Sequence, residues 1–140
     1  MKTSIRRIAL PALLIAALAC AAVAVAAPSS GTYKGKIEYQ GYDVKFKVSG
    51  GKVTKFSARM LQDCGDGFET FTIAPKGGFK IEGNSVDAKR VDTYGKSKAT
   101  VILKGKFSGS KFKGSVREYD FVPGSGIVCD TLKRKFTAKK

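Results

Sequence analysis

The chain has 140 residues, of which 26 are lysine or arginine and 11 are aspartate or glutamate, so its formal net charge is +15 at pH 7. It contains no histidine, which excludes a histidine general base, a histidine-activated serine or cysteine nucleophile and a histidine metal ligand. The strong positive charge favours a partner that is negatively charged.

Residues 1–26 are predicted to be a cleaved signal peptide. Lys2, Arg6 and Arg7 precede a long apolar run, and Ala24-Val25-Ala26 is a small-residue cleavage site. An uncleaved membrane anchor is one alternative. A lipoprotein attached through Cys20 is another, although the residues before this cysteine fit a lipidation motif poorly. Cleavage after Ala26 removes three basic residues, lowers the formal charge from +15 to +12, and predicts a protein that is secreted or held in the cell envelope.

Residues 32–140 are predicted to form a single all-β domain after a flexible lead-in at residues 27–31. Apolar and polar residues alternate with a period of two, interrupted by Gly, Ser, Asn and Pro, and no helical period is present. The predicted strands are 32–39, 42–49, 53–63, 68–74, 79–82, 85–92, 98–107 and 111–122, with 129–138 as a ninth. We therefore expect an antiparallel meander of about eight to nine strands, closed into a barrel or a two-layer sandwich so that neither face nor edge is left open.

Glycine-containing turns predict the strand registers. A two-residue turn at Gln40-Gly41 would place Gly35 opposite Phe46, and a turn at Gly50-Gly51 would place Val48 opposite Val53, with a bulge near residues 53–54. A loop at 108–111 would place Phe107 opposite Phe112, Gly105 opposite Gly114 and Leu103 opposite Val116. The last hairpin would place Val116 opposite Phe136.

Two cysteines remain after residue 26, Cys64 and Cys129, and they are predicted to form a disulfide because an isolated pair in an exported chain usually does. They stand 65 positions apart. The segment 63–69, which holds Cys64 between carboxylates and glycines, is interpreted as a turn that carries this disulfide, because its spacing is not that of a calcium-binding loop.

The polar faces of the predicted strands are unusually rich in lysine. The registers above place Lys34 opposite Lys47, Lys36 opposite Lys45, Lys106 opposite Lys113 and Arg117 opposite Lys135, while Glu38 faces Asp43. Directly opposed like charges destabilise a sheet, so this pattern predicts either an anion-binding belt or an ordinary solvated surface. The predicted anion-binding residues are Lys34, Lys36, Lys45, Lys47, Lys55, Lys106, Lys113, Arg117 and Lys135.

Glu118 and Arg134 fall on the apolar side of their strands. The predicted register places them opposite each other, so they are expected to form an interior ion pair. Glu118 and Asp120 share this side of one strand and are the only carboxylate pair suited to acid–base catalysis.

Several segments resemble a loose group of small secreted bacterial β-rich proteins of unknown function. The segments are "GTYKGK", "VKFKVSGGKV", "GKFSGSKFKGSV" and "CDTLKRKFTA", together with "FSA" ahead of Cys64. The resemblance implies an exported β-rich fold with a cysteine pair, and it implies no activity.

The leading functional hypothesis is a non-enzymatic binding module for an anionic cell-envelope or extracellular polymer, or for an anionic membrane surface. No cofactor or metal is predicted. A specific nucleic-acid partner is not predicted either, since exposed aromatic residues for base stacking are few. The alternative is a small β-barrel that carries an apolar ligand. The third hypothesis is an enzyme with a carboxylate-based site.

Overall fold

The computed structural model of the protein describes residues 27–140. Within this range the chain is all β, as predicted, and no helix is long and apolar enough to cross a membrane. The predicted signal peptide and Cys20 lie outside the described residues. The strands are β1 (Gly31–Ile37), β2 (Asp43–Ser49), β3 (Lys52–Asp63), β4 (Phe68–Ile73), β5 (Phe79–Lys80), β6 (Ser85–Tyr94), β7 (Ser97–Ser108), β8 (Lys111–Val122), β9 (Gly126–Asp130) and β10 (Arg134–Lys139).

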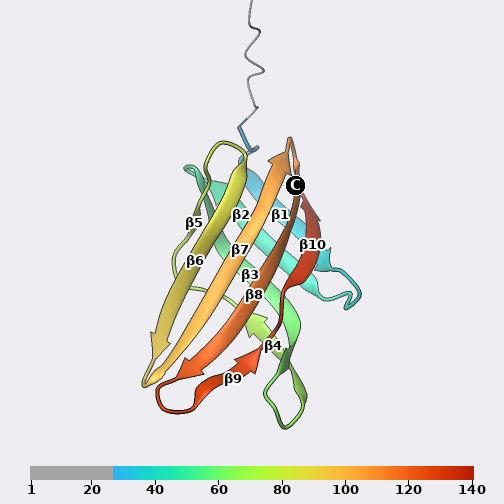
Figure 1. The fold of residues 1–140 in the computed structure, drawn as a ribbon. Helices are drawn as coiled ribbons and strands as arrows, with labels where there is room; N and C mark the ends of the chain where they lie inside the picture. The colour runs from blue at the N-terminus through green and yellow to red at the C-terminus, as the bar shows by residue number, and fades with distance from the viewer. Residues whose placement is uncertain (1–26) are drawn as a thin grey trace, which may run out of the picture.

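The strands join into an uneven ring (Figure 1). β10 pairs with β1 on one edge and with β8 on the other, which brings the two ends of the described chain together. From β1 the sheet continues through β2 to β3, and from β8 it continues through β7 to β6. Two thin connections complete the ring. β9, which pairs with β8, meets β3 through the single pair Asp63 and Asp130, and the two-residue strand β5 pairs with β3 and is followed by a tight turn into β6. We call the gap beyond β5, between β4 and β6, the seam.

Aromatic residues fill the interior at the end of the ring nearest the 108–111 loop. Phe46 stacks on Tyr33 with ring centroids 5.1 Å apart and lies edge-on to Phe107, Phe112 and Phe136. These five side chains are at most 3% exposed. Burial of each large aromatic side chain contributes on the order of 2 to 3 kcal/mol, so this cluster stabilises the ring closure at β10. The opposite end of the ring, with β4, β9 and the disulfide, is called the disulfide end.

Two of the predicted hairpin registers are confirmed. Val48 lies opposite Val53, and the β7–β8 hairpin has Phe107 opposite Phe112 and Gly105 opposite Gly114. A bulge is present after the first of these turns, but it lies beyond the predicted residues 53–54, at Lys55, which has a φ of 49°.

Two other predicted registers are wrong by two residues. Between β1 and β2 the loop spans five residues, 38–42, so Phe46 lies opposite Tyr33 and not opposite Gly35. In the last hairpin Val116 lies opposite Arg134 and not opposite Phe136. The segment predicted as one strand at 129–138 is two strands, β9 and β10, because the chain turns at Leu132, which has a φ of 56°.

Gly35 sets how closely β1 approaches β10. A Cβ atom at this position would lie 2.0 Å from the carbonyl oxygen of Thr137, which is backbone and cannot rotate away. We expect Gly35→Ala to force the two strands apart and to lower the free energy of unfolding by about 1 to 3 kcal/mol, the usual range for overpacking. Urea denaturation checks this, and an unchanged midpoint would show that the strands have room for a side chain.

Candidate functional site

The outer face of β2, β1, β10 and β8 carries four directly opposed lysines. Lys34 on β1 lies between Lys45 on β2 and Lys139 on β10, and Lys139 lies opposite Lys111 on β8. All four are exposed, and none forms an ion pair within residues 27–140. Because neighbouring strands are about 4.8 Å apart, these residues form a line about 14 Å long. We call them the lysine row.

A second line of charged residues runs beside the lysine row on the same face, two residues further along each strand. Lys106 on β7 lies opposite Lys113 on β8, as predicted, and Thr137 separates Lys113 from Lys36 on β1. Lys36 pairs with Asp43, Nζ to Oδ1 2.6 Å, and this hydrogen bond holds the pKa of Asp43 below its usual range.

The prediction of facing Lys34–Lys47 and Lys36–Lys45 pairs is therefore wrong. The two-residue register shift replaces it with Lys34 opposite Lys45 and Lys36 opposite Asp43. The prediction that Glu38 faces Asp43 fails for the same reason, and Glu38 instead lies beside Lys135, to whose carbonyl oxygen its backbone N–H donates at 2.9 Å.

Three adjoining hollows lie along β7, β8 and β10 beside these lines. Their volumes are about 310, 420 and 240 Å³, and each shares at least one lining lysine with the next. Glu38 is the one acidic residue among the residues that line them. The basic residues that line them are Lys104, Lys106, Lys111, Lys113, Arg117, Lys133 and Lys135. The lysine row and these hollows together are called the basic face.

The other predicted anion-binding residues lie around the basic face. Lys47, opposite Thr32 and Thr54, extends it along β2, and Lys55 follows in the bulge of β3. Lys135 lies opposite Ser115 and not opposite Arg117.

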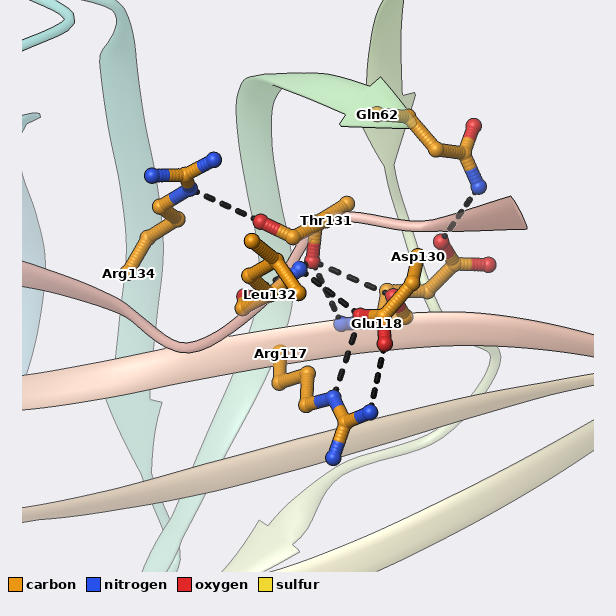
Figure 2. Close-up of polar contacts among 7 residues, drawn as sticks. All are labelled: Gln62, Arg117, Glu118, Asp130, Thr131, Leu132 and Arg134. Carbon is orange, nitrogen blue, oxygen red and sulfur yellow. Dashed lines mark hydrogen bonds and ion pairs between the residues drawn. The ribbon is translucent and has the colours of Figure 1, made fainter. Parts of the chain in front are cut away.

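Arg117 is held by Asp130 of β9, with Nε to Oδ1 at 3.0 Å and Nη2 on the other carboxylate oxygen (Figure 2). Burial alone would raise the pKa of Asp130, but hydrogen bonds from Arg117 and from the Leu132 N–H hold it below its usual range. This pairing leaves Arg117 less available to an anion than the lysines are.

The corner between β9 and β10 is fixed to β8 by polar contacts (Figure 2). The Thr131 hydroxyl accepts from the Glu118 N–H at 2.8 Å, and Arg134 Nε donates to the Thr131 carbonyl at 2.7 Å. The predicted Glu118–Arg134 ion pair is wrong, because the register places Arg134 opposite Val116 and turns its guanidinium to Thr131. Glu118 instead accepts a hydrogen bond from Gln62 Nε2 at 3.1 Å.

A second site, of opposite charge, lies at the seam. It is a pocket of about 480 Å³ whose walls come from β4, the segment after β4, and the inner faces of β6, β7 and β8. Asp92, Ala99 and Asp120 lie side by side across β6, β7 and β8, so both carboxylates point to the same interior. We call it the seam pocket, and its lining residues are Phe71, Thr72, Ile73, Ala74, Pro75, Asp92, Tyr94, Ser97, Ala99, Val101, Glu118 and Asp120.

Side chains of β6 hold the seam together where no strand ladder does. The Lys76 N–H donates to Asp92 Oδ2 at 2.9 Å, and Arg90 Nη2 donates to the Lys76 carbonyl at 2.9 Å. Gly77 leaves room for this guanidinium, which a Cβ atom there would meet at 2.7 Å.

Glu118 is the most perturbed acid of the described chain. Its side chain is 1% exposed, and burial raises its pKa to about 8, helped by the negative charges of Asp120 and Asp130. Glu118 and Asp120 stand two positions apart on β8 and line the same pocket, so the charge of one opposes the ionisation of the other. The pair therefore resembles two acids that share one proton.

The disulfide predicted between Cys64 and Cys129 is present. Glu69 lies near both sulfur atoms, and this trio is the one group in residues 27–140 with three metal-ligand atoms close enough to hold one ion. The sulfurs are bonded to each other and are not thiolates, so the group is not a metal centre.

Sequence reasoning missed several residues of both sites. Lys104, Lys111 and Lys133 belong to the basic face, and Asp92 belongs to the seam pocket. The alternation of polar and apolar residues along each strand shows whether these side chains point outward or inward. Which residues lie beside them depends on the pairing of β10 with β1 and of β6 with β7.

Fold and sites together define an all-β ring with one disulfide, a basic outer face and an acidic pocket at its seam. Comparison with protein-family models, with curated proteins and with solved structures finds no match to this chain. The resemblance to small secreted bacterial β-rich proteins therefore stays a prediction.

Proposed function

We propose that this protein is a non-enzymatic binding module whose basic face holds an anionic polymer outside the cytoplasm. The lysine row is the observation that carries the proposal. Four opposed like charges cost the sheet about a few tenths of a kcal/mol for each pair, and three such contacts occur in one line. A ligand with regularly spaced negative charges removes this repulsion when it binds.

An extended polymer fits the basic face better than a membrane surface does. The lysine row is a line of charges that continues beside adjoining hollows, so a chain can lie along it. Membrane-surface sites combine basic residues with apolar side chains that enter the lipid. The exposed apolar residues Phe68, Ile127 and Val128 belong to the disulfide end, and Tyr39 and Leu132, the sequence neighbours of Glu38 and Lys133, stand at one edge of the basic face and not along the lysine row.

Recognition is expected to be electrostatic and without base readout. Lysine contacts an anion as a point charge, and nucleic-acid surfaces usually add exposed aromatic residues on which bases stack. Tyr119, the aromatic residue next to the basic face, is covered by the guanidinium of Arg117 at 5.1 Å. We therefore propose a polyuronate or phosphodiester polymer of the cell envelope as the partner class.

The disulfide is compatible with a location outside the cytoplasm, where such bonds persist. Secretion, or retention in the cell envelope, is part of the proposal. It places the basic face where anionic envelope polymers are found.

Removing the lysine row tests the function. We expect the variant with Lys34, Lys45, Lys111 and Lys139 all changed to Gln to bind polygalacturonate at least tenfold more weakly in low salt. The slope of log affinity against log salt should become shallower by roughly one unit for each lysine that contacts the polymer. Fluorescence anisotropy across a salt series measures both quantities.

The matched control changes Lys52, Lys89, Lys96 and Lys98 to Gln, which removes the same charge from exposed positions outside the basic face. Equal weakening in both variants would show that only net charge matters and would reject the basic face as the site. Tight binding to phosphatidylglycerol vesicles without binding to the polymer would identify a membrane surface as the partner.

A further inference from the structure

The seam pocket has one feature that the proposed polymer binding does not use. Glu118 is buried inside an otherwise basic protein, and one of its carboxylate oxygens, Oε1, has no hydrogen-bond partner. Figure 2 shows the other oxygen bonded to Gln62. A buried polar atom without a partner costs about 1 to 3 kcal/mol, so this oxygen is a group that a ligand can satisfy.

A second acid lies beside Glu118 on the same strand. Asp120, two residues along β8, also lines the pocket, and its charge opposes the ionisation of Glu118. Two neighbouring carboxyl groups repel each other when both are ionised, unless a proton or a cation lies between them. With the pocket empty the proton fills this role, which agrees with the raised pKa of Glu118.

The charges around the pocket favour a cation. Asp92 lines it from β6, and Asp130 adds negative charge from behind β8. No lysine or arginine is among the lining residues. Two basic side chains stand at its edge. Arg90 lies opposite Val101, which lines the pocket, and its Nη2 donates to the Lys76 carbonyl while its buried Nε has no partner. Lys76 lies 5.6 Å from the centre of the Tyr94 ring.

The shape of the pocket separates an organic cation from a metal ion. Glu118, Asp120 and Asp92 do not converge on one point as metal ligands do, since the one such group within residues 27–140 is the disulfide trio. The volume of about 480 Å³ is that of a small-molecule pocket, and apolar residues such as Phe71, Pro75 and Val101 form much of the wall. Phe71 and Tyr94 are partly exposed and present ring surface that an organic cation can contact.

We propose that the seam pocket binds a small organic ammonium ion with an apolar body, its charge held by Glu118 and Asp120 and its body packed against Phe71 and Tyr94. On binding, the ammonium group takes the place of the proton on Glu118, and this proton passes to the solvent. The affinity therefore increases with pH until Glu118 is ionised in the empty protein. This site is independent of the basic face.

The probe for this site is 2-phenylethylamine, with 2-phenylethanol as its uncharged analogue. We expect isothermal titration calorimetry to show binding of the amine and at least tenfold weaker binding of the alcohol. Between pH 6 and pH 7.5 the affinity for the amine should rise by up to tenfold per pH unit, and the heat should vary with the ionisation enthalpy of the buffer because a proton is released.

Single substitutions separate the roles of Glu118 and Asp120. Asp120→Asn should weaken amine binding at least tenfold, and Glu118→Gln should both weaken it and abolish proton release. The lysine-row variant should bind the amine as the unchanged protein does, so the two sites can fail separately. Equal binding of amine and alcohol, or no binding of the amine to the unchanged protein, would overturn the proposal even if both acid variants misfold.

Discussion

Replacing both cysteines with alanine is expected to lower the free energy of unfolding by about 4 kcal/mol, the value that the loop-entropy model gives for a disulfide closing a loop of this length. The bond joins residues 65 positions apart. It also holds a part of the ring where the ladder is thin, because Asp63 opposite Asp130 is the one backbone pair between β3 and β9. Since small domains are stable by only about 5 to 15 kcal/mol, this loss is a large fraction of the total.

Urea denaturation of the oxidised protein, the reduced protein and the Cys64→Ala, Cys129→Ala double variant measures the effect. The reduced protein and the double variant should coincide. Hydrogen exchange should show that β4 and β9 lose protection first, while β1, β8 and β10 stay protected by the aromatic cluster. A loss below about 1 kcal/mol would mean that the unfolded chain is already compact or that the ring does not depend on this link.

The strands and two of the hairpins could be predicted because their determinants are local. Period-two alternation gives the strands, and the glycine pairs and short loops fix where Val48 meets Val53 and where Phe107 meets Phe112. The cysteine pair could be predicted because the two cysteines are isolated in a domain that is predicted to be exported.

The wrong registers come from residues whose backbone conformation is uncommon for their type. Tyr39 has a φ of 64° and Leu132 has a φ of 56°, and bulky residues rarely adopt this left-handed conformation. At Leu132 the turn is stabilised by the carboxylate of Asp130, which accepts from its N–H at 2.7 Å. A short sequence pattern therefore gives no sign of the turn.

The two sites differ in how far they can be predicted from the sequence alone. The basic face follows from alternation and lysine content, so most of its residues could be named, although their partners across the sheet could not. The seam pocket depends on the approach of β4, β6 and β8, which are far apart in sequence. Glu118 and Asp120 could be recognised as a carboxylate pair, but their shared environment with Asp92 could not.

Glu118 makes the stability of the protein depend on pH in an unusual direction. Its pKa is about 8 in the folded state against an ordinary value of 4.5. Between these two values the folded state keeps a proton that the unfolded state has released, so the free energy of unfolding falls as pH rises and levels off above pH 8. This one group contributes a slope of at most about 1.4 kcal/mol per pH unit, reduced where water reaches the pocket and screens the charge.

Glu118→Gln should remove this slope. The amide stays neutral at every pH, keeps the acceptor for Gln62 and offers Asp120 a hydrogen-bond donor. We expect the variant to match the unchanged protein near pH 5 and to be more stable by about 1 to 3 kcal/mol at pH 9, given the screened slope over this interval. Urea denaturation at pH 5, 7 and 9 measures the difference, with the exposed Glu69→Gln as the matched control. Parallel pH profiles for the unchanged protein and Glu118→Gln would show that Glu118 is ionised in the folded state, and the unpartnered oxygen would then need a cation that is already bound.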